Sequence, residues 1–262
     1  MSKQTLLITL GCSLTEGMGC YDFTEFPRDS TVYSPNILKP QREYQFNEFH
    51  KKGWPNKLGK LLGYDMVLNL GYGGASPSFN LKLFMEKYRN ESFSQYDVFI
   101  LWWLPQSHRF SFYKDRRLYT LIPDTDGSND INTIFANDYL KFIDDYPTDS
   151  ILETKFYLEL MEDYCKLKGY NFLWVSQDDQ YLKETNSSSW MGLIMDDIMH
   201  FPTYKLSITC GHPNELGYSD IANSFYNILQ TKHKHLLPRT PSRNMKWEWN
   251  GKPRENTSFN KI

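Results

Sequence analysis

An apolar stretch near the start of the chain stops at a glycine, and this junction constrains the fold more than any other feature. Residues 6–10 read Leu-Leu-Ile-Thr-Leu, and Gly11, Cys12 and Ser13 follow directly. A continuous apolar run of this kind is typical of a strand in a parallel sheet, whose strands are buried on both faces. Ligands of open α/β proteins bind at the carboxyl ends of such strands, so we expect the Ser13 hydroxyl at that edge.

Strand and helix patterns alternate along the rest of the chain. Strands are predicted over residues 4–10, 65–70, 96–104, 170–176 and 204–209, and helices over residues 54–62, 77–90, 150–168 and 214–230. This alternation predicts a three-layer α/β/α domain around a parallel sheet of five strands. The chain has 262 residues, enough for one such domain with insertions, and we assign residues 1–230 to it.

Two segments interrupt this pattern, and both leave the carboxyl edge of the predicted sheet. Residues 17–50 are rich in glycine, proline and aromatic residues, without a helical or alternating period. Residues 108–148 begin with a predicted hairpin over 110–122 and continue as an acidic stretch with a short helix near 133–143. Long insertions in compact domains are usually functional. We therefore expect both to border one pocket and to favour an extended substrate or partner.

Ser13 has two interpretations. A serine placed after a strand and a glycine often caps the following helix with its hydroxyl. It is instead a nucleophile if a base reaches it, with N–H groups of the turn stabilising a developing oxyanion. The candidate base is His212, within the stretch Cys-Gly-His-Pro-Asn-Glu-Leu-Gly-Tyr over residues 210–218. The Pro-Asn pair after this histidine indicates a loop that presents the imidazole just before a helix.

Together these two stretches resemble the SGNH (GDSL-like) hydrolase family, whose first block reads Gly-Asp-Ser-Leu and whose last block reads Asp-x-x-His-Pro. The resemblance extends from about residue 6 to about residue 230 and implies a flavodoxin-like order of strands. It implies that Ser13 is the nucleophile and His212 its base. It also implies an oxyanion hole made of the N–H groups of Ser13 and Gly74 and the side chain of Gln106.

Gln106 departs from the family pattern, which has an asparagine at this position. The longer glutamine side chain moves the amide donor by one carbon–carbon bond. This matters because oxyanion donors must lie about 2.7–3.1 Å from the developing charge. His108 and Arg109 are alternatives for the third donor, or else residues of the substrate rim or residues with a structural role.

The orienting acid of the family is also missing. Its aspartate, three residues before the histidine, falls on Thr209, and Cys210 stands two residues before. Loss of this acid in a catalytic triad lowers the rate by orders of magnitude while some activity remains. A main-chain carbonyl, or Asp196 or Asp197 from the preceding loop, is the alternative for orienting the His212 ring.

Two hypotheses follow from these residues. The first is an SGNH-type serine esterase that removes O-acyl groups, preferably acetyl groups, from a carbohydrate or another small ester. The aromatic residues of the insertions would then supply stacking surfaces for sugar rings. The second is a structural or binding protein that keeps the fold with weak or no catalysis, such as a virion or appendage component. Retention of Ser13 and His212 favours the first, and the altered acid and asparagine favour the second.

Charge constrains the partners. The whole chain has a formal net charge of −2, which gives no indication of nucleic-acid binding. Residues 231–262, however, hold eight Lys or Arg and two Glu, a net charge of +6. We interpret this segment as a basic C-terminal tail, either a solvated terminus or an arm that docks on an acidic protein partner. In the second hypothesis this tail anchors the protein.

The remaining composition indicates where the protein is synthesised and whether it requires a cofactor. No apolar run has the length of a membrane span and no signal peptide is recognised, so we expect cytoplasmic synthesis without membrane association. The four cysteines form no Cys-x-x-Cys pair, and we expect them to be small buried packing residues. A zinc or disulfide role for Cys12 and Cys210 is the alternative. No cofactor or metal is needed for the chemistry above.

Overall fold

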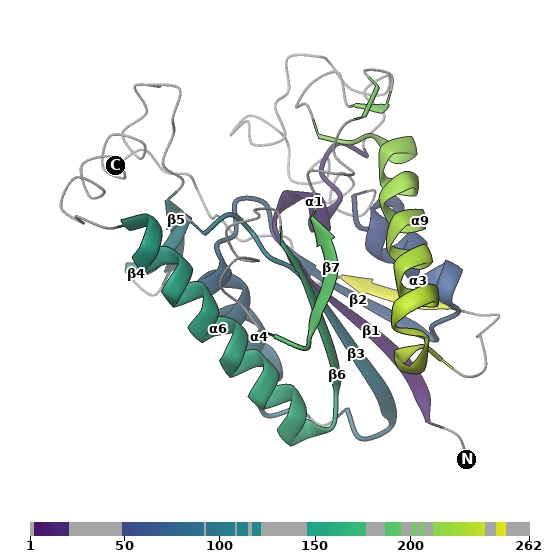
Figure 1. Ribbon diagram of the computed structural model, residues 1–262. Helices are drawn as coiled ribbons and strands as arrows, with labels where there is room; N and C mark the ends of the chain where they lie inside the picture. The colour runs from purple at the N-terminus through teal and green to yellow at the C-terminus, as the bar shows by residue number, and fades with distance from the viewer. Residues whose placement is uncertain are drawn as a thin grey trace.

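The computed structural model describes residues 3–20, 49–91, 93–107, 109–114, 117–121, 146–176, 187–194, 201–202, 205–206, 212–238 and 245–249. These include the ends of both predicted insertions but not their central parts, and the short helix expected near 133–143 lies outside them. The described residues fold around one parallel sheet, with a separate two-stranded hairpin (Figure 1).

Six strands form the main sheet among the described residues, in the order β7-β6-β3-β1-β2-β8. Their bounds are β1 Gln4–Gly11, β2 Met66–Gly71, β3 Tyr96–Trp103, β6 Asn171–Ser176, β7 Trp190–Ile194 and β8 Lys246–Trp249. Every neighbouring pair is parallel. The predicted three-layer α/β/α fold is confirmed: β2-β1-β3-β6-β7 follow the flavodoxin-like order, and β8 extends the sheet beyond β2.

The central strands β1 and β3 are buried on both faces because nearly all their residues are apolar. Alternate residues enter two separate hydrophobic clusters, one on each side of the sheet. One cluster takes Leu6, Ile8 and Leu10 of β1 with Val98, Ile100 and Trp102 of β3, and the other takes Leu7 of β1 with Phe99, Leu101 and Trp103 of β3. Complete burial of each such side chain is worth about 1.5–3 kcal/mol, so these strands form the rigid centre of the fold.

Helices cover both faces of the sheet (Figure 1). They are α3 Trp54–Leu62 and α9 Glu215–Lys232 on one face, and α4 Pro77–Tyr88 and α6 Tyr146–Lys168 on the other. On the first face Trp54 lies 6.0 Å from Trp103 and 4.7 Å from Phe225, measured between ring centroids. On the second face Phe84 meets Tyr164 edge to face at 5.6 Å. The Trp54–Phe225 contact packs α9 against α3.

Most of the predicted elements are confirmed. The helices expected over 54–62, 77–90, 150–168 and 214–230 correspond to α3, α4, α6 and α9. The hairpin expected over 110–122 is formed by β4 (Phe110–Lys114) and β5 (Arg117–Leu121), which pair antiparallel. Of the helices in the described part of the chain, none has both the length and the apolar character that a membrane span requires.

Two strands differ from the predictions. The fifth strand expected over 204–209 is wrong for its described residues, since Lys205 lies in a helical turn and Leu206 forms an isolated antiparallel bridge with Pro213. The fifth strand is instead β7, whose irregular register against β6 leaves no clear alternating pattern. Residues 246–249, expected in a tail beyond residue 230, form β8 on the edge of the sheet.

The carboxyl ends of β1, β2 and β3 are level with one another. Gly11 at the end of β1 lies opposite Gly71 at the end of β2, and Leu10 lies opposite Trp102 of β3. The residues that follow these three strands therefore gather at one edge of the sheet. The short helix α1 (Ser13–Glu16) begins there, directly after β1 (Figure 1).

Candidate active site

Ser13 and His212 meet at this edge. The Ser13 Oγ atom lies 2.8 Å from Nε2 of His212, although the two residues are 199 positions apart. Ser13 is the first residue of α1, and the N-cap position belongs to Cys12, whose side chain makes no capping hydrogen bond. The hydroxyl of Ser13 is thus turned to an imidazole and does not cap the helix.

Close backbone contact brings α1 onto the end of β2. A Cβ atom added at Gly71 would lie 2.2 Å from the Glu16 nitrogen, so only glycine allows this approach. The buried side chain of Asn69 then joins the pieces. Its Nδ2 donates to the Thr15 carbonyl at 2.8 Å, and its Oδ1 accepts from the Gly71 N–H at 2.9 Å and from Thr9 Oγ1 at 3.3 Å. Asn69 thereby fixes α1, and Ser13 with it, relative to two strands.

Glu16 ties α1 to the loop that follows β2. This glutamate is 3% exposed, and its Oε2 accepts a hydrogen bond of 2.7 Å from the Gly73 N–H. A buried hydrogen bond is costly to break, so it restrains the loop. The neighbouring residue is Gly74, with a left-handed φ of 76°. Glu16 therefore sets the position of Gly74 relative to Ser13.

The backbone N–H groups at this edge include two, on neighbouring strand ends, that have no acceptor among the described residues. One belongs to Ser13, in the first turn of α1, where helical N–H groups lack intrahelical partners. The other belongs to Gly74. Both follow the ends of neighbouring parallel strands, as the register of β1 and β2 requires. N–H groups of this kind are the donors from which oxyanion holes are built.

Gln106 follows β3 at the same edge, and Arg109 determines which end of its amide is available. Arg109 Nη2 donates to Gln106 Oε1 at 3.1 Å, and the Arg109 backbone N–H donates to the Gln106 carbonyl at 3.2 Å. A guanidinium only donates, so the amide oxygen of Gln106 faces it and the Nε2 donor points elsewhere. His108, the other candidate of this segment, lies outside the described residues.

The turn after α1 holds the backbone of His212. The hydroxyl of Tyr218, in α9, donates to the Met18 carbonyl at 2.7 Å. Beside it, a Cβ atom added at Gly19 would lie 2.6 Å from the Pro213 carbonyl oxygen and 3.0 Å from His212 Cβ. Gly19 also has a left-handed φ of 96°, which glycine adopts without strain. The chain segment that carries Ser13 is therefore packed directly against the segment that carries His212.

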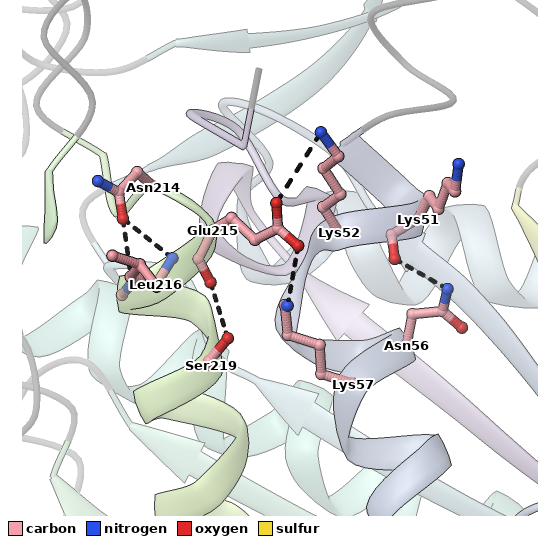
Figure 2. A network of polar contacts seen from close by, with 9 residues as sticks. Lys51, Lys52, Asn56, Lys57, Asn214, Glu215, Leu216 and Ser219 are labelled. Atoms are coloured by element: carbon pink, nitrogen blue, oxygen red, sulfur yellow. Dashed lines mark hydrogen bonds and ion pairs between the residues drawn. The ribbon is translucent and has the colours of Figure 1, made fainter. Parts of the chain in front are cut away.

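The loop of His212 leads into α9, whose first turn is shown in Figure 2. Asn214 is the N-cap, and its Oδ1 accepts from the N–H groups of Leu216 at 3.0 Å and Gly217 at 3.2 Å. Glu215 pairs with Lys57 at 3.3 Å and with Lys52 at 3.9 Å, which links the start of α9 to α3 and to the helical segment before it (Figure 2). These contacts determine the position of the His212 loop relative to the sheet.

The remaining candidates lie mostly outside the described residues. Asp196 and Asp197, named as orienting acids, are among these, as are Thr209 and Cys210. Cys12, together with Cys20 and Cys165, is buried and forms no disulfide. Within the described part of the chain, no three His, Cys, Asp or Glu side chains gather as ligands for a metal ion.

Sequence reasoning missed the residues that hold the site together: Glu16, Gly19, Asn69 and Tyr218. Asn69 carried a usable signal, because it is a polar residue in the middle of an apolar strand, and a buried polar side chain needs partners. Gly19 and Tyr218 had no such signal. Their roles depend on contacts between segments about 200 residues apart.

Comparison with known proteins supports the fold. No family model and no curated protein matches the chain. Among solved structures it is similar to a carbohydrate esterase whose active site displays divergent catalytic and non-catalytic binding functions, with 12% sequence identity, a TM-score of 0.51, and 90% of this chain and 68% of that chain covered. It also matches LAE5, an α/β hydrolase from the metagenome of Lake Arreo, Spain, with 14% identity, a TM-score of 0.33, and 88% and 97% covered. The first similarity shows a shared fold, and the second carries no argument.

Proposed function

We propose that this protein is an SGNH-type serine esterase. The observation that carries the proposal is the 2.8 Å contact between Ser13 Oγ and His212 Nε2. A serine hydroxyl becomes a nucleophile when a neighbouring base accepts its proton, and this distance is within the hydrogen-bond range that such transfer requires. Ser13 is 9% exposed and His212 is partly exposed, so the pair lies at the edge of the hydrophobic core and not within it.

The reaction proceeds through an acyl-enzyme. Ser13 Oγ bonds to the ester carbonyl carbon while His212 Nε2 takes its proton, and the carbonyl oxygen becomes an oxyanion. The N–H groups of Ser13 and Gly74 and the Nε2 amide of Gln106 are the proposed donors to that oxyanion. Collapse of the intermediate breaks the bond to the alcohol, which leaves with the proton from His212. Water activated by His212 then releases the acid and restores Ser13.

The proposed substrates are O-acetylated carbohydrates. Two observations support this choice over other esters. The solved structure with a shared fold is a carbohydrate esterase. In addition, the segment over residues 17–50, which leaves the sheet next to Ser13, is rich in aromatic residues, and flat aromatic side chains are suited to stacking on sugar rings.

Hydrolysis of p-nitrophenyl acetate tests the proposal. Ser13→Ala and His212→Ala should each lower kcat/KM by about 10³-fold or more, since removing either residue disables the nucleophile. Ser219→Ala and His235→Ala are matched controls, because Ser219 bonds only within α9 and His235 is exposed in the short helix after it. Both should retain the wild-type rate. Equal hydrolysis by wild type and Ser13→Ala would overturn the proposal and leave the non-catalytic binding protein as the account of the fold.

A further inference from the structure

Arg109 carries a positive charge that no described residue balances. Its Nε and Nη1 atoms are buried and have no hydrogen-bond partner, and its Nη2 donates only to the neutral Gln106 amide. Among the described residues no carboxylate lies within ion-pair distance of it. A guanidinium is a permanent cation in proteins.

Arg109 is partly exposed as a residue, but the charge sets its buried N–H groups apart from other buried groups without partners. In the described part of the chain these are mostly neutral atoms, such as the indole nitrogens of Trp54 and Trp103 and the hydroxyl of Tyr64. A neutral donor without a partner is tolerated at moderate cost, whereas a buried charge normally requires a counter-charge or a metal. The N–H groups of Arg109 therefore indicate an anionic ligand.

The position of Arg109 points to the substrate as the source of that anion. Gln106 and Arg109 follow the end of β3, and Ser13 follows the end of β1, the strand that pairs with β3. Arg109 is bonded to Gln106 through both its side chain and its backbone. A group bound by Arg109 would therefore lie beside the proposed third donor of the oxyanion hole.

We propose that Arg109 binds an anionic group of the substrate, a carboxylate or a phosphate, so that the enzyme acts on O-acylated acidic sugars. This inference rests on the proposed esterase function and specifies its substrate class. Arginine is suited to the task because its planar fork of N–H groups matches the oxygens of both anions. Binding would neutralise the charge of Arg109 and leave its bond to Gln106 in place.

Three sugars that differ only at carbon 6 test this inference: galactose, galacturonate and galactose 6-phosphate. Each is measured as an inhibitor of p-nitrophenyl acetate hydrolysis at constant ionic strength. Wild type should bind at least one of the two acids about tenfold or more tightly than galactose, and which acid it is identifies the anion. Equal inhibition by all three sugars would overturn the inference while leaving the esterase intact.

Substitution of Arg109 tests whether this residue is responsible. Arg109→Gln should abolish the preference for the acid, and Arg109→Lys, which keeps the charge without the fork, should retain part of it. Arg89→Gln removes the same charge from an exposed position at the end of α4 and should keep the full preference. An Arg109→Gln variant that still prefers the acid would contradict the assignment.

Calorimetric titration separates this inference from the esterase proposal, because it needs no turnover. Galacturonate and galactose 6-phosphate are titrated into wild type and Ser13→Ala, with galactose as the reference. Preferential binding of an acid by both proteins supports the role of Arg109 even if hydrolysis fails. Absence of any preference contradicts that role even if hydrolysis succeeds.

Discussion

The two halves of the candidate site are held in place by different kinds of contact. On the serine side, α1 is fixed by hydrogen bonds of Asn69 and Glu16, which are both 3% exposed. On the histidine side, the loop before α9 is fixed partly by a helix cap and by ion pairs of Glu215, whose side chain is 51% exposed. Buried polar contacts are costly to break, whereas exposed ion pairs contribute little.

This difference implies that Ser13 is more rigidly held than His212. The turn at Met18 and Gly19 links the serine side to the histidine side by close packing. Substitutions should therefore have graded effects. The largest belong to the buried network, intermediate ones to the turn and the cap, and the smallest to the surface ion pairs.

The largest effect is expected for Asn69→Ala. This change leaves Thr9, Thr15 and Gly71 without their partner and should lower the free energy of unfolding by about 3 kcal/mol, measured by urea denaturation. Asn56→Ala is the matched control, since Asn56 is equally buried but makes one hydrogen bond, to the Lys51 carbonyl. Its loss should be about 1 kcal/mol. Equal losses would show that burial alone, and not the network, determines the stability.

The next effect is expected for Gly19→Ala, which should act mainly on catalysis. The new methyl group would press on His212 and Pro213, and a displacement of about 1 Å in a catalytic group lowers kcat by about 10²-fold. Gly169→Ala is the control, because Gly169 has a similar φ of +70° with nothing within 4 Å of an added Cβ. Both variants should lose about 1–3 kcal/mol from backbone strain. If both retain full activity, the Gly19 contact does not position His212.

A smaller effect is expected for Asn214→Ala. Loss of the cap should lower the free energy of unfolding by about 1 kcal/mol, whereas Asn214→Asp should restore it because aspartate supplies the same acceptor. Since the capped turn directly follows His212, we expect a severalfold decrease in kcat for the alanine variant, recovered in the aspartate variant. Thermal denaturation and p-nitrophenyl acetate hydrolysis measure the two quantities. Recovery of stability without recovery of kcat would separate the cap from the histidine.

The smallest effect is expected for Glu215→Gln. Its ion pairs with Lys52 and Lys57 are partly exposed, so their removal should change the free energy of unfolding by no more than about 0.5 kcal/mol. The change should also disappear at high salt, because exposed charges are screened. Denaturation at low and high ionic strength provides the measurement. A loss comparable to that of Asn69→Ala would invalidate the ranking of the two sides.

The layers of the fold could be predicted from the sequence because local residue patterns specify the strands and helices that form them. The apolar runs of β1 and β3 and the helical spacing of α3 and α9 are visible without tertiary information. The edge strands β7 and β8 were not predicted, since β8 has only four residues and β7 pairs irregularly with β6. Such strands are defined by the neighbour that they pair with, and their own residues give little indication of it.

The residues of the candidate site could be named from the sequence, but their contacts could not. Ser13 and His212 could be named from the stretches around them, but whether Ser13 capped α1 or faced His212 depended on a contact across 199 positions. Gln106 could be placed by counting along β3. The structure was needed to show that Arg109 binds the amide oxygen of Gln106, so that the Nε2 donor points elsewhere.

The central claim is that His212 makes Ser13 a nucleophile, and reaction with a fluorophosphonate tests it most directly. After labelling, proteolysis and mass spectrometry would locate the modified residue. We expect one phosphonyl group per chain, attached to Ser13, and a labelling rate at least about 10²-fold lower in His212→Ala. Absence of label on Ser13, or an unchanged rate in His212→Ala, would contradict the claim.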